Sequence, residues 1–128
     1  MNNFNKLIEI RNICKKYAFS DNAKKSHFYK KSNLDCMCAV ASAFLFKNMP
    51  KSKFVVGYFN GNGHCWVEQD GCIFDITASQ FGEKDIIVTF DKDPRYFVKK
   101  KYKNIPDFTC LVGQSPQIHD LFEIYGVI

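Results

Sequence analysis

The chain has 128 residues, of which 46% are hydrophobic and 16% aromatic, and this composition excludes an intrinsically disordered protein. The length favours a single domain, residues 1–128, with a full hydrophobic core, and the net charge of +5 is modest. No apolar run approaches the roughly 18 residues that cross a bilayer, and the first residues lack the charged and then apolar order of a secretory signal. We therefore expect a cytoplasmic protein with no membrane partner.

The N-terminal third predicts two helices joined by a polar connection. In residues 4–18, apolar side chains recur at helical spacing, which is typical of an amphipathic helix. Residues 19–33 are rich in Ser, Asn and Lys and predict a long connection. The run 36–46 is apolar nearly all round and rich in Ala, so it predicts a buried central helix that ends before Pro50.

The sequence changes to a strand pattern after Pro50. Short runs rich in β-branched and aromatic residues predict strands at residues 54–59, 64–68, 72–76 and 86–90. Asp70-Gly71, between the second and third runs, is a strong signal for a two-residue hairpin turn. The lysine-rich stretch after the turn 91–94 is ambiguous, and residues 115–125 favour a closing helix. Helices first and strands after argue for an α+β fold with a mostly antiparallel sheet.

The cysteines and the lysines invite other interpretations. A disulfide framework would suit a secreted chain, and a zinc site needs paired C-x-x-C motifs. Neither Cys36-Met37-Cys38 nor His64-Cys65 fits a standard zinc pattern, so we expect no metal and no cofactor, and most cysteines as small buried hydrophobes. The basic cluster 99–103 has aromatic neighbours that could stack on bases. We favour a solvated face over a nucleic-acid partner, and steering toward an acidic partner stays open.

The predicted hairpin brings a histidine and an acid together. If Asp70-Gly71 forms the turn, Trp66 pairs with Asp75 across the two strands. Because side chains alternate along a strand, His64, Trp66 and Asp75 share one face. Diagonal neighbours lie about 7 to 8 Å apart at the backbone, close enough for a carboxylate to reach an imidazole. This register follows from the turn alone.

A cysteine at the start of the central helix completes a nucleophilic site. The positive end of a helix dipole favours thiolate over thiol, and a nearby histidine can take the proton. The orphan N–H groups of the helix start, including the amide of Cys38, could stabilise an oxyanion. The chain order Cys38, His64, Asp75 is therefore coherent as nucleophile, base and orienter.

Three linked motifs resemble those of small bacterial papain-fold and transglutaminase-like proteins. Residues 34–42, with a cysteine followed by Ala-Val-Ala-Ser, resemble the nucleophile helix of that superfamily. Residues 63–68 look like its histidine strand, and residues 70–81, with Asp-x-Thr-x-x-Gln-Phe, look like its acid strand. The resemblance implies a papain/transglutaminase-like core, with the nucleophile helix packed on the sheet. The flanks of the chain match nothing that we can place.

One departure from that pattern concerns the nucleophile. Cys36 stands where the family usually has glycine, so Cys36 competes with Cys38 for the role. We prefer Cys38, because Ala41 and Ser42 fall at the family offsets only when they are counted from it.

The residues around the expected triad also have structural interpretations. We expect Trp66 to pack beside the imidazole as a wall of the cleft, and Gln80 to hydrogen-bond the loop after the acid strand without a catalytic role. Asp75 could instead cap the following turn with help from Thr77, and His64 could be a structural strand histidine. Only the joint occurrence of the three residue types points to catalysis.

The resemblance implies a cysteine-nucleophile acyl-transfer enzyme that acts on an amide or a thioester of a protein or peptide. Water as acceptor would make it a peptidase or a glutamine deamidase, and an amine would make it a transglutaminase. Small domains of this kind often occur as effectors or toxins delivered to a target cell. One alternative is a catalytically degenerate papain-fold binding module, and another is a metal-binding protein that uses Cys36, Cys38, His64 or Cys65. The sequence leaves the oligomeric state open.

Overall fold

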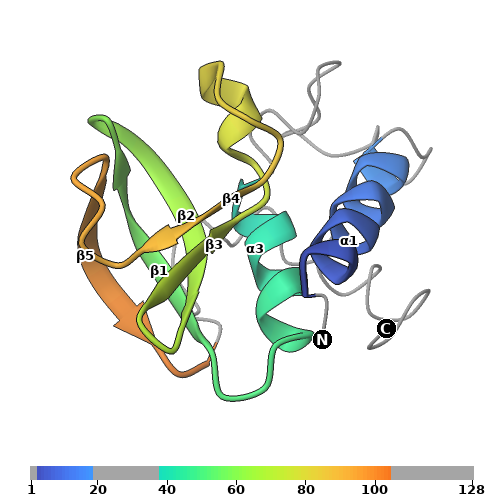
Figure 1. Ribbon diagram of the computed structural model, residues 1–128, viewed down its shortest axis with the longest axis horizontal. Helices are drawn as coiled ribbons and strands as arrows, with labels where there is room; N and C mark the ends of the chain where they lie inside the picture. Colours follow the sequence, from blue (N-terminus) through green and yellow to red (C-terminus); the bar gives the residue numbers. More distant parts are fainter. Residues whose placement is uncertain (1–2, 19–37, 105–128) are drawn as a thin grey trace.

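The computed structural model describes residues 3–18 and 38–104, which form an α+β fold with one five-stranded antiparallel sheet (Figure 1). The helices are α1 (Asn3–Ala18) and α3 (Cys38–Lys47), and the short 3-10 helix is η1 (Ala78–Phe81). The strands are β1 (Lys53–Phe59), β2 (Asn62–Gln69), β3 (Cys72–Asp75), β4 (Ile87–Phe90) and β5 (Tyr96–Tyr102). Their order in the sheet is β4-β3-β2-β1-β5, and α3 lies between the sheet and α1.

These elements confirm the predicted α+β class and most of the predicted segments. Each predicted strand is present to within two residues at either end, and the ambiguous lysine-rich stretch forms β5. The predicted connection 19–33, Cys36 and the predicted closing helix 115–125 lie outside the described residues. Among the residues that are described, no helix is long and apolar enough to cross a membrane.

Two tight turns fix the register of the central hairpins. Asn60 and Gly61 join β1 to β2, and Asp70 and Gly71 join β2 to β3, all with positive φ between 47° and 83°. Positive φ at both central residues is the signature of the type I′ turn, whose twist matches that of the strands. The ladder Gln69↔Cys72, Glu68↔Ile73 and Val67↔Phe74 confirms the predicted register.

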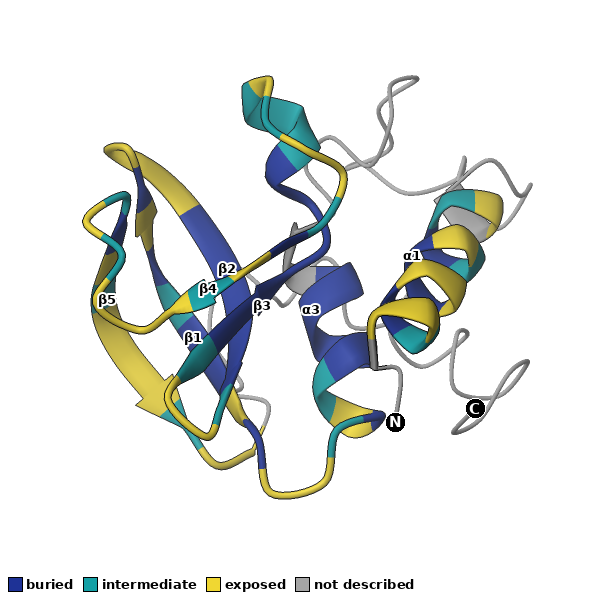
Figure 2. Cartoon of the chain, viewed as in Figure 1, coloured by how far each residue is buried: buried dark blue, intermediate teal, exposed yellow. Residues whose placement is uncertain are grey.

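The core is divided between the two faces of the sheet. Figure 2 shows that α3, β2 and β3 consist largely of buried residues. On one face, α3 buries its apolar side chains against α1, β2 and β3, as the composition of the predicted central helix implied; this cluster comprises Leu7, Ile10, Cys14, Val40, Ala41, Phe44, Leu45, Val67, Phe74 and Ile76. The other face buries a second cluster, made of Val55, Phe59, Trp66, Ile73, Ala78, Ile87 and Tyr96. Both faces are therefore apolar, and polar groups on either one need partners within the protein.

Strand β5 contains a bulge that changes which side chains point inward. Gly57 of β1 pairs with Val98, but the preceding Val56 pairs with Lys100, so Lys99 has no partner in the ladder. Before the bulge, Tyr96 and Val98 face the cluster around Trp66; after it, Tyr102 faces the α3 side.

Gly57 is where the bulged strand comes closest to β1. A Cβ at this position would lie 2.0 Å from the carbonyl oxygen of Phe97 and 2.8 Å from the Trp66 ring. A backbone oxygen cannot give way as a flexible side chain does, so the contact requires glycine.

We therefore expect Gly57→Ala to lower the free energy of unfolding by at least about 2 kcal/mol, because the added methyl group forces β1 and β5 apart. Chemical denaturation followed by circular dichroism measures this change. Gly63→Ala is the matched control, since no described atom lies within 4 Å of its added Cβ. If the two variants were equally stable, β5 would not lie close enough to Gly57 to exclude a methyl group, and this explanation would be wrong.

Candidate active site

A buried histidine–aspartate pair lies at the centre of the candidate site. The Nε2 atom of His64 on β2 is 2.8 Å from Oδ2 of Asp75 at the end of β3. Both side chains are 0% exposed. The sequence predicted this diagonal pairing from the Asp70-Gly71 turn, and the structure brings the two side chains together.

The Asp75 carboxylate accepts hydrogen bonds on both oxygens. The backbone N–H of Thr77 donates to Oδ1 at 3.0 Å, and the hydroxyl of Tyr96 donates to Oδ2 at 2.8 Å, beside the imidazole. The turn-capping role and the histidine-orienting role, which were alternatives on sequence grounds, are thus filled by the same carboxylate. Together with His64 Nε2, these groups give the carboxylate three hydrogen-bond donors. The three bonds offset the free-energy cost of burying the carboxylate away from water.

Tyr96 is a site residue that the sequence did not reveal. It is the first residue of β5, and the bonds that place it there are formed with β1. Burial and the nearby negative charge of Asp75 raise the pKa of Tyr96 far above its ordinary value. The hydroxyl therefore stays protonated and keeps donating to the carboxylate.

The second ring nitrogen of His64 faces Gln80. The side-chain nitrogen Nε2 of Gln80 lies 3.3 Å from Nδ1 of the imidazole. We had expected this glutamine to bond the loop after the acid strand. The structure shows its amide on the imidazole, because η1 brings both Gln80 and Phe81 against His64.

Aromatic rings surround the imidazole. The centroids of Phe59, Trp66 and Phe81 lie 6.1, 6.0 and 5.0 Å from that of His64. Trp66 packs beside the imidazole as predicted, but it is 0% exposed and so belongs to the core rather than to the wall of an open cleft. These rings exclude water from the pair and strengthen its hydrogen bonds.

Arg11 of α1 holds the segment that follows Asp75. Its buried guanidinium donates to the backbone oxygen of Ile76 at 3.1 Å and to Oγ of Ser79 at 3.0 Å. The guanidinium also lies 3.5 Å from the exposed carboxylate of Asp85. The sequence placed Arg11 only within an amphipathic helix. Its role depends on α1 packing beside a segment 65 residues away in the chain.

Helix α3 begins at Cys38, the preferred nucleophile, and is fixed to β2 at two points. Ser42 Oγ donates to the backbone oxygen of Cys65 at 3.0 Å, and beyond the other end of the helix Gln69 Nε2 donates to the Pro50 oxygen at 2.7 Å. The start of α3 therefore lies at the His64 end of β2, where η1 also lies (Figure 1). Nothing is described for the Cys38 side chain or for Cys36.

Strand alternation places α3 and His64 on opposite faces of β2. Cys65 and Val67 face α3, whereas His64 and Trp66 face the cluster on the other side. A group from the start of α3 would thus meet the imidazole around the end of the strand and not through the sheet. Gly63 at that end has no side chain, and no described atom lies within 4 Å of its absent Cβ.

The other described cysteines behave as expected for small core residues. Cys14 and Cys65 are buried, and Cys72 is half-buried. Burial raises the pKa of the Cys14 thiol to about 12. No three His, Cys, Asp or Glu side chains of the described segments gather as metal ligands would.

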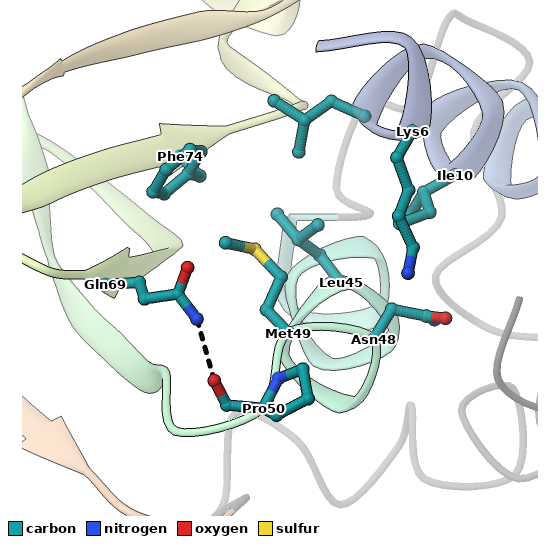
Figure 3. A pocket seen from close by; sticks show the side chains of 9 residues that line it. Lys6, Ile10, Leu45, Asn48, Met49, Pro50, Gln69 and Phe74 are labelled. Carbon is teal, nitrogen blue, oxygen red and sulfur yellow. Dashed lines mark hydrogen bonds between the residues drawn. The ribbon is translucent and has the colours of Figure 1, made fainter. Parts of the chain in front are cut away.

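The pocket shown in Figure 3 lies away from the histidine. It has a volume of about 240 Å³ and lies between α1, the end of α3 and the β2–β3 hairpin, lined by Lys6, Leu7, Ile10, Leu45, Asn48, Met49, Pro50, Gln69 and Phe74. It shares no residue with the His64 cluster. Among the described residues, its lining offers one titratable group, Lys6, and neither a thiol nor a hydroxyl, so we place the candidate chemistry at His64.

The lysines of β5 form an exposed surface with local partners. Lys101 Nζ lies 2.6 Å from Glu68 Oε1, and the Lys100 ammonium lies 5.2 Å from the centroid of the Tyr102 ring. These contacts fit the solvated face that the sequence favoured.

We expect Arg11→Met to destabilise the protein by about 2 kcal/mol, because the buried Ile76 oxygen loses a charged donor. Thermal and urea unfolding measure the loss. Lys16→Met on the exposed side of the same helix should change stability by less than about 0.5 kcal/mol. Two variants of equal stability would contradict the anchoring role of Arg11.

Comparisons with known proteins do not supply a family. No family model, no curated protein and no solved structure matches the chain.

Proposed function

We propose that the chain is a cysteine-nucleophile acyl-transfer enzyme with a papain/transglutaminase-like core in a single domain. Its substrate would be an amide or a thioester of a protein or peptide. The observation that carries the proposal is the buried bond between His64 and Asp75, which lies at the end of β2 where α3 begins with Cys38. Asp75 orients the ring through Nε2, so Nδ1 is the nitrogen that serves as base.

In the first step, the Cys38 thiol gives its proton to Nδ1 of His64 and its sulfur attacks the substrate carbonyl carbon. The carbonyl π electrons move to oxygen, and the N–H groups at the start of α3 stabilise the resulting oxyanion. The positive end of the helix dipole favours the thiolate during this step.

In the second step, the tetrahedral intermediate collapses, and the bond from carbon to the leaving nitrogen or sulfur breaks. The proton on Nδ1 goes to that leaving group, and a thioester joins the acyl group to Cys38. Water or an amine then attacks the thioester, with His64 again as base, and the thiol is regenerated. The acceptor decides between peptidase, deamidase and transglutaminase, and the shape of the substrate cleft selects it.

The burial of His64 sets a condition on this mechanism. Because the side chain is 0% exposed, Nδ1 can exchange protons only with a group packed directly against it. The thiol must therefore approach around the end of β2, beside Gly63.

The same burial favours a second candidate, the catalytically degenerate binding module. A fully enclosed histidine–aspartate pair also serves as a structural link between β2 and β3, and Cys36 replaces the glycine that the resembling family has before its nucleophile. This candidate predicts an ordinary thiol at Cys38 and unchanged partner binding in Cys38→Ala.

The decisive test is the pH dependence of iodoacetamide alkylation, with the modified residue located by mass spectrometry. We expect one fast-reacting cysteine, Cys38, with an apparent pKa below the ordinary value of about 8.5. The apparent pKa should return toward that value in His64→Ala, because the thiol loses the base. Cys36→Ala should leave the reaction unchanged.

Cys14 provides an internal control in every sample. Its buried thiol, with a pKa raised to about 12, should react only after unfolding. Labelling of Cys14 would reveal a misfolded variant. A native protein in which Cys38 reacts no faster than an ordinary thiol would contradict the enzyme and favour the binding module.

A further inference from the structure

His64 presents its two ring nitrogens to two different side chains, Asp75 at Nε2 and Gln80 at Nδ1. We propose that Gln80, assisted by Tyr96, holds His64 as the neutral imidazole with its proton on Nε2. Gln80 is then a positioning residue that keeps Nδ1 as a hydrogen-bond acceptor. The role of this state in catalysis depends on the proposed function, but the state itself does not.

The partners of Nε2 decide where the proton lies. An ionised carboxylate has no proton to donate, so Nε2 must donate at the 2.8 Å contact with Asp75 Oδ2. In a neutral imidazole the other nitrogen then carries a lone pair. The amide nitrogen of Gln80, 3.3 Å from Nδ1, is a suitable donor to it.

Protonation of Nδ1 would oppose this arrangement. The new N–H would point at the N–H group of Gln80, and the amide would have to rotate to offer its oxygen. A hydrogen bond to the neutral form of a group disfavours its charged form. The backbone that carries Gln80 is not free to withdraw, because Arg11 binds Ile76 and Ser79 just before it.

Tyr96 also disfavours the imidazolium, through its hydrogen bond to Asp75. Its hydroxyl and His64 Nε2 donate to the same oxygen of Asp75, each at 2.8 Å. The negative charge of that oxygen is shared between two donors, so it stabilises an imidazolium less than an unshared carboxylate would.

Apart from Asp75, the described groups that contact the His64 ring carry no charge and do not favour the imidazolium. Among the described residues, β1 and η1 present the uncharged rings of Phe59 and Phe81. The guanidinium of Arg95 lies 5.6 Å from the centroid of Phe59, but the carboxylates of Asp93 and Glu83 pair with it, so it adds no isolated positive charge near the ring. Asp75 is the one acidic group that contacts the ring within this part of the chain. These described groups therefore favour a neutral imidazole, and transfer of a thiol proton to Nδ1 requires the Gln80 amide to turn.

Long-range ¹H–¹⁵N spectra of protein labelled at its three histidines test the proposal. The protein carries Cys38→Ala, and His64→Gln assigns the His64 signals. We expect the Nε2–H tautomer at pH 7. In Gln80→Glu, whose carboxylate accepts from Nδ1–H, the midpoint of the His64 titration should rise by about 1 pH unit or more. Tyr96→Phe should raise it by a smaller amount.

Two matched substitutions serve as controls. Gln69→Glu changes an amide that binds Pro50 instead, and Tyr58→Phe removes a hydroxyl from the half-exposed part of β1. Neither should move the His64 midpoint. An Nδ1–H tautomer, an imidazolium at pH 7, or an unchanged midpoint in a folded Gln80→Glu protein would overturn the proposal.

The outcome is separable from that of the alkylation test. An Nε2–H imidazole together with an ordinary Cys38 thiol would retain this inference and remove the enzyme. A reactive Cys38 together with a protonated His64 would support the enzyme and overturn the inference about Gln80. If both hold, Gln80→Ala in protein that keeps Cys38 should lower the apparent pKa of the thiol further, because the imidazolium is no longer disfavoured.

Discussion

The buried carboxylate of Asp75 is the constraint on which the rest of the structure depends. A charge at 0% exposure is tolerable only when hydrogen bonds replace its lost hydration. Its three donors come from three places, namely the backbone just after β3, the imidazole on β2 and the hydroxyl on β5. The carboxylate thus fixes the turn into η1, the orientation of the imidazole and the position of the first residue of β5 at once.

The sequence predicted those parts of the site that depend on local rules. Asp70-Gly71 fixed the β2–β3 register, and strand alternation then placed His64 and Asp75 on one face. Gln80 was recognised as part of a motif, but its partner depended on how η1 folds back. The nucleophile assignment remains a prediction, because neither Cys36 nor the side chain of Cys38 lies within the described residues.

Long-range packing accounts for what the sequence could not show. Tyr96 and Tyr102 are six residues apart and would share a face in a regular strand, but the bulge at Lys99 directs them to opposite faces. The sequence of β5 therefore lacks a continuous alternation of apolar and polar residues, and its three consecutive lysines are not typical of a strand. Arg11 likewise has no local signal, because its acceptors lie in a segment that only the tertiary fold brings beside α1.

The strand order has a consequence for the order in which the molecule assembles. β1 to β4 each pair with the strand that precedes or follows them along the chain, whereas β5 must return across the sheet to pair with β1. Until β5 docks, Asp75 has only part of its set of donors. Loop closure delays such non-local pairing, so we expect the chain to complete the surroundings of the buried Asp75 carboxylate late in folding. The hydrogen bond from Tyr96 thereby couples the edge strand to the centre of the protein, and we expect both to form in the same cooperative transition.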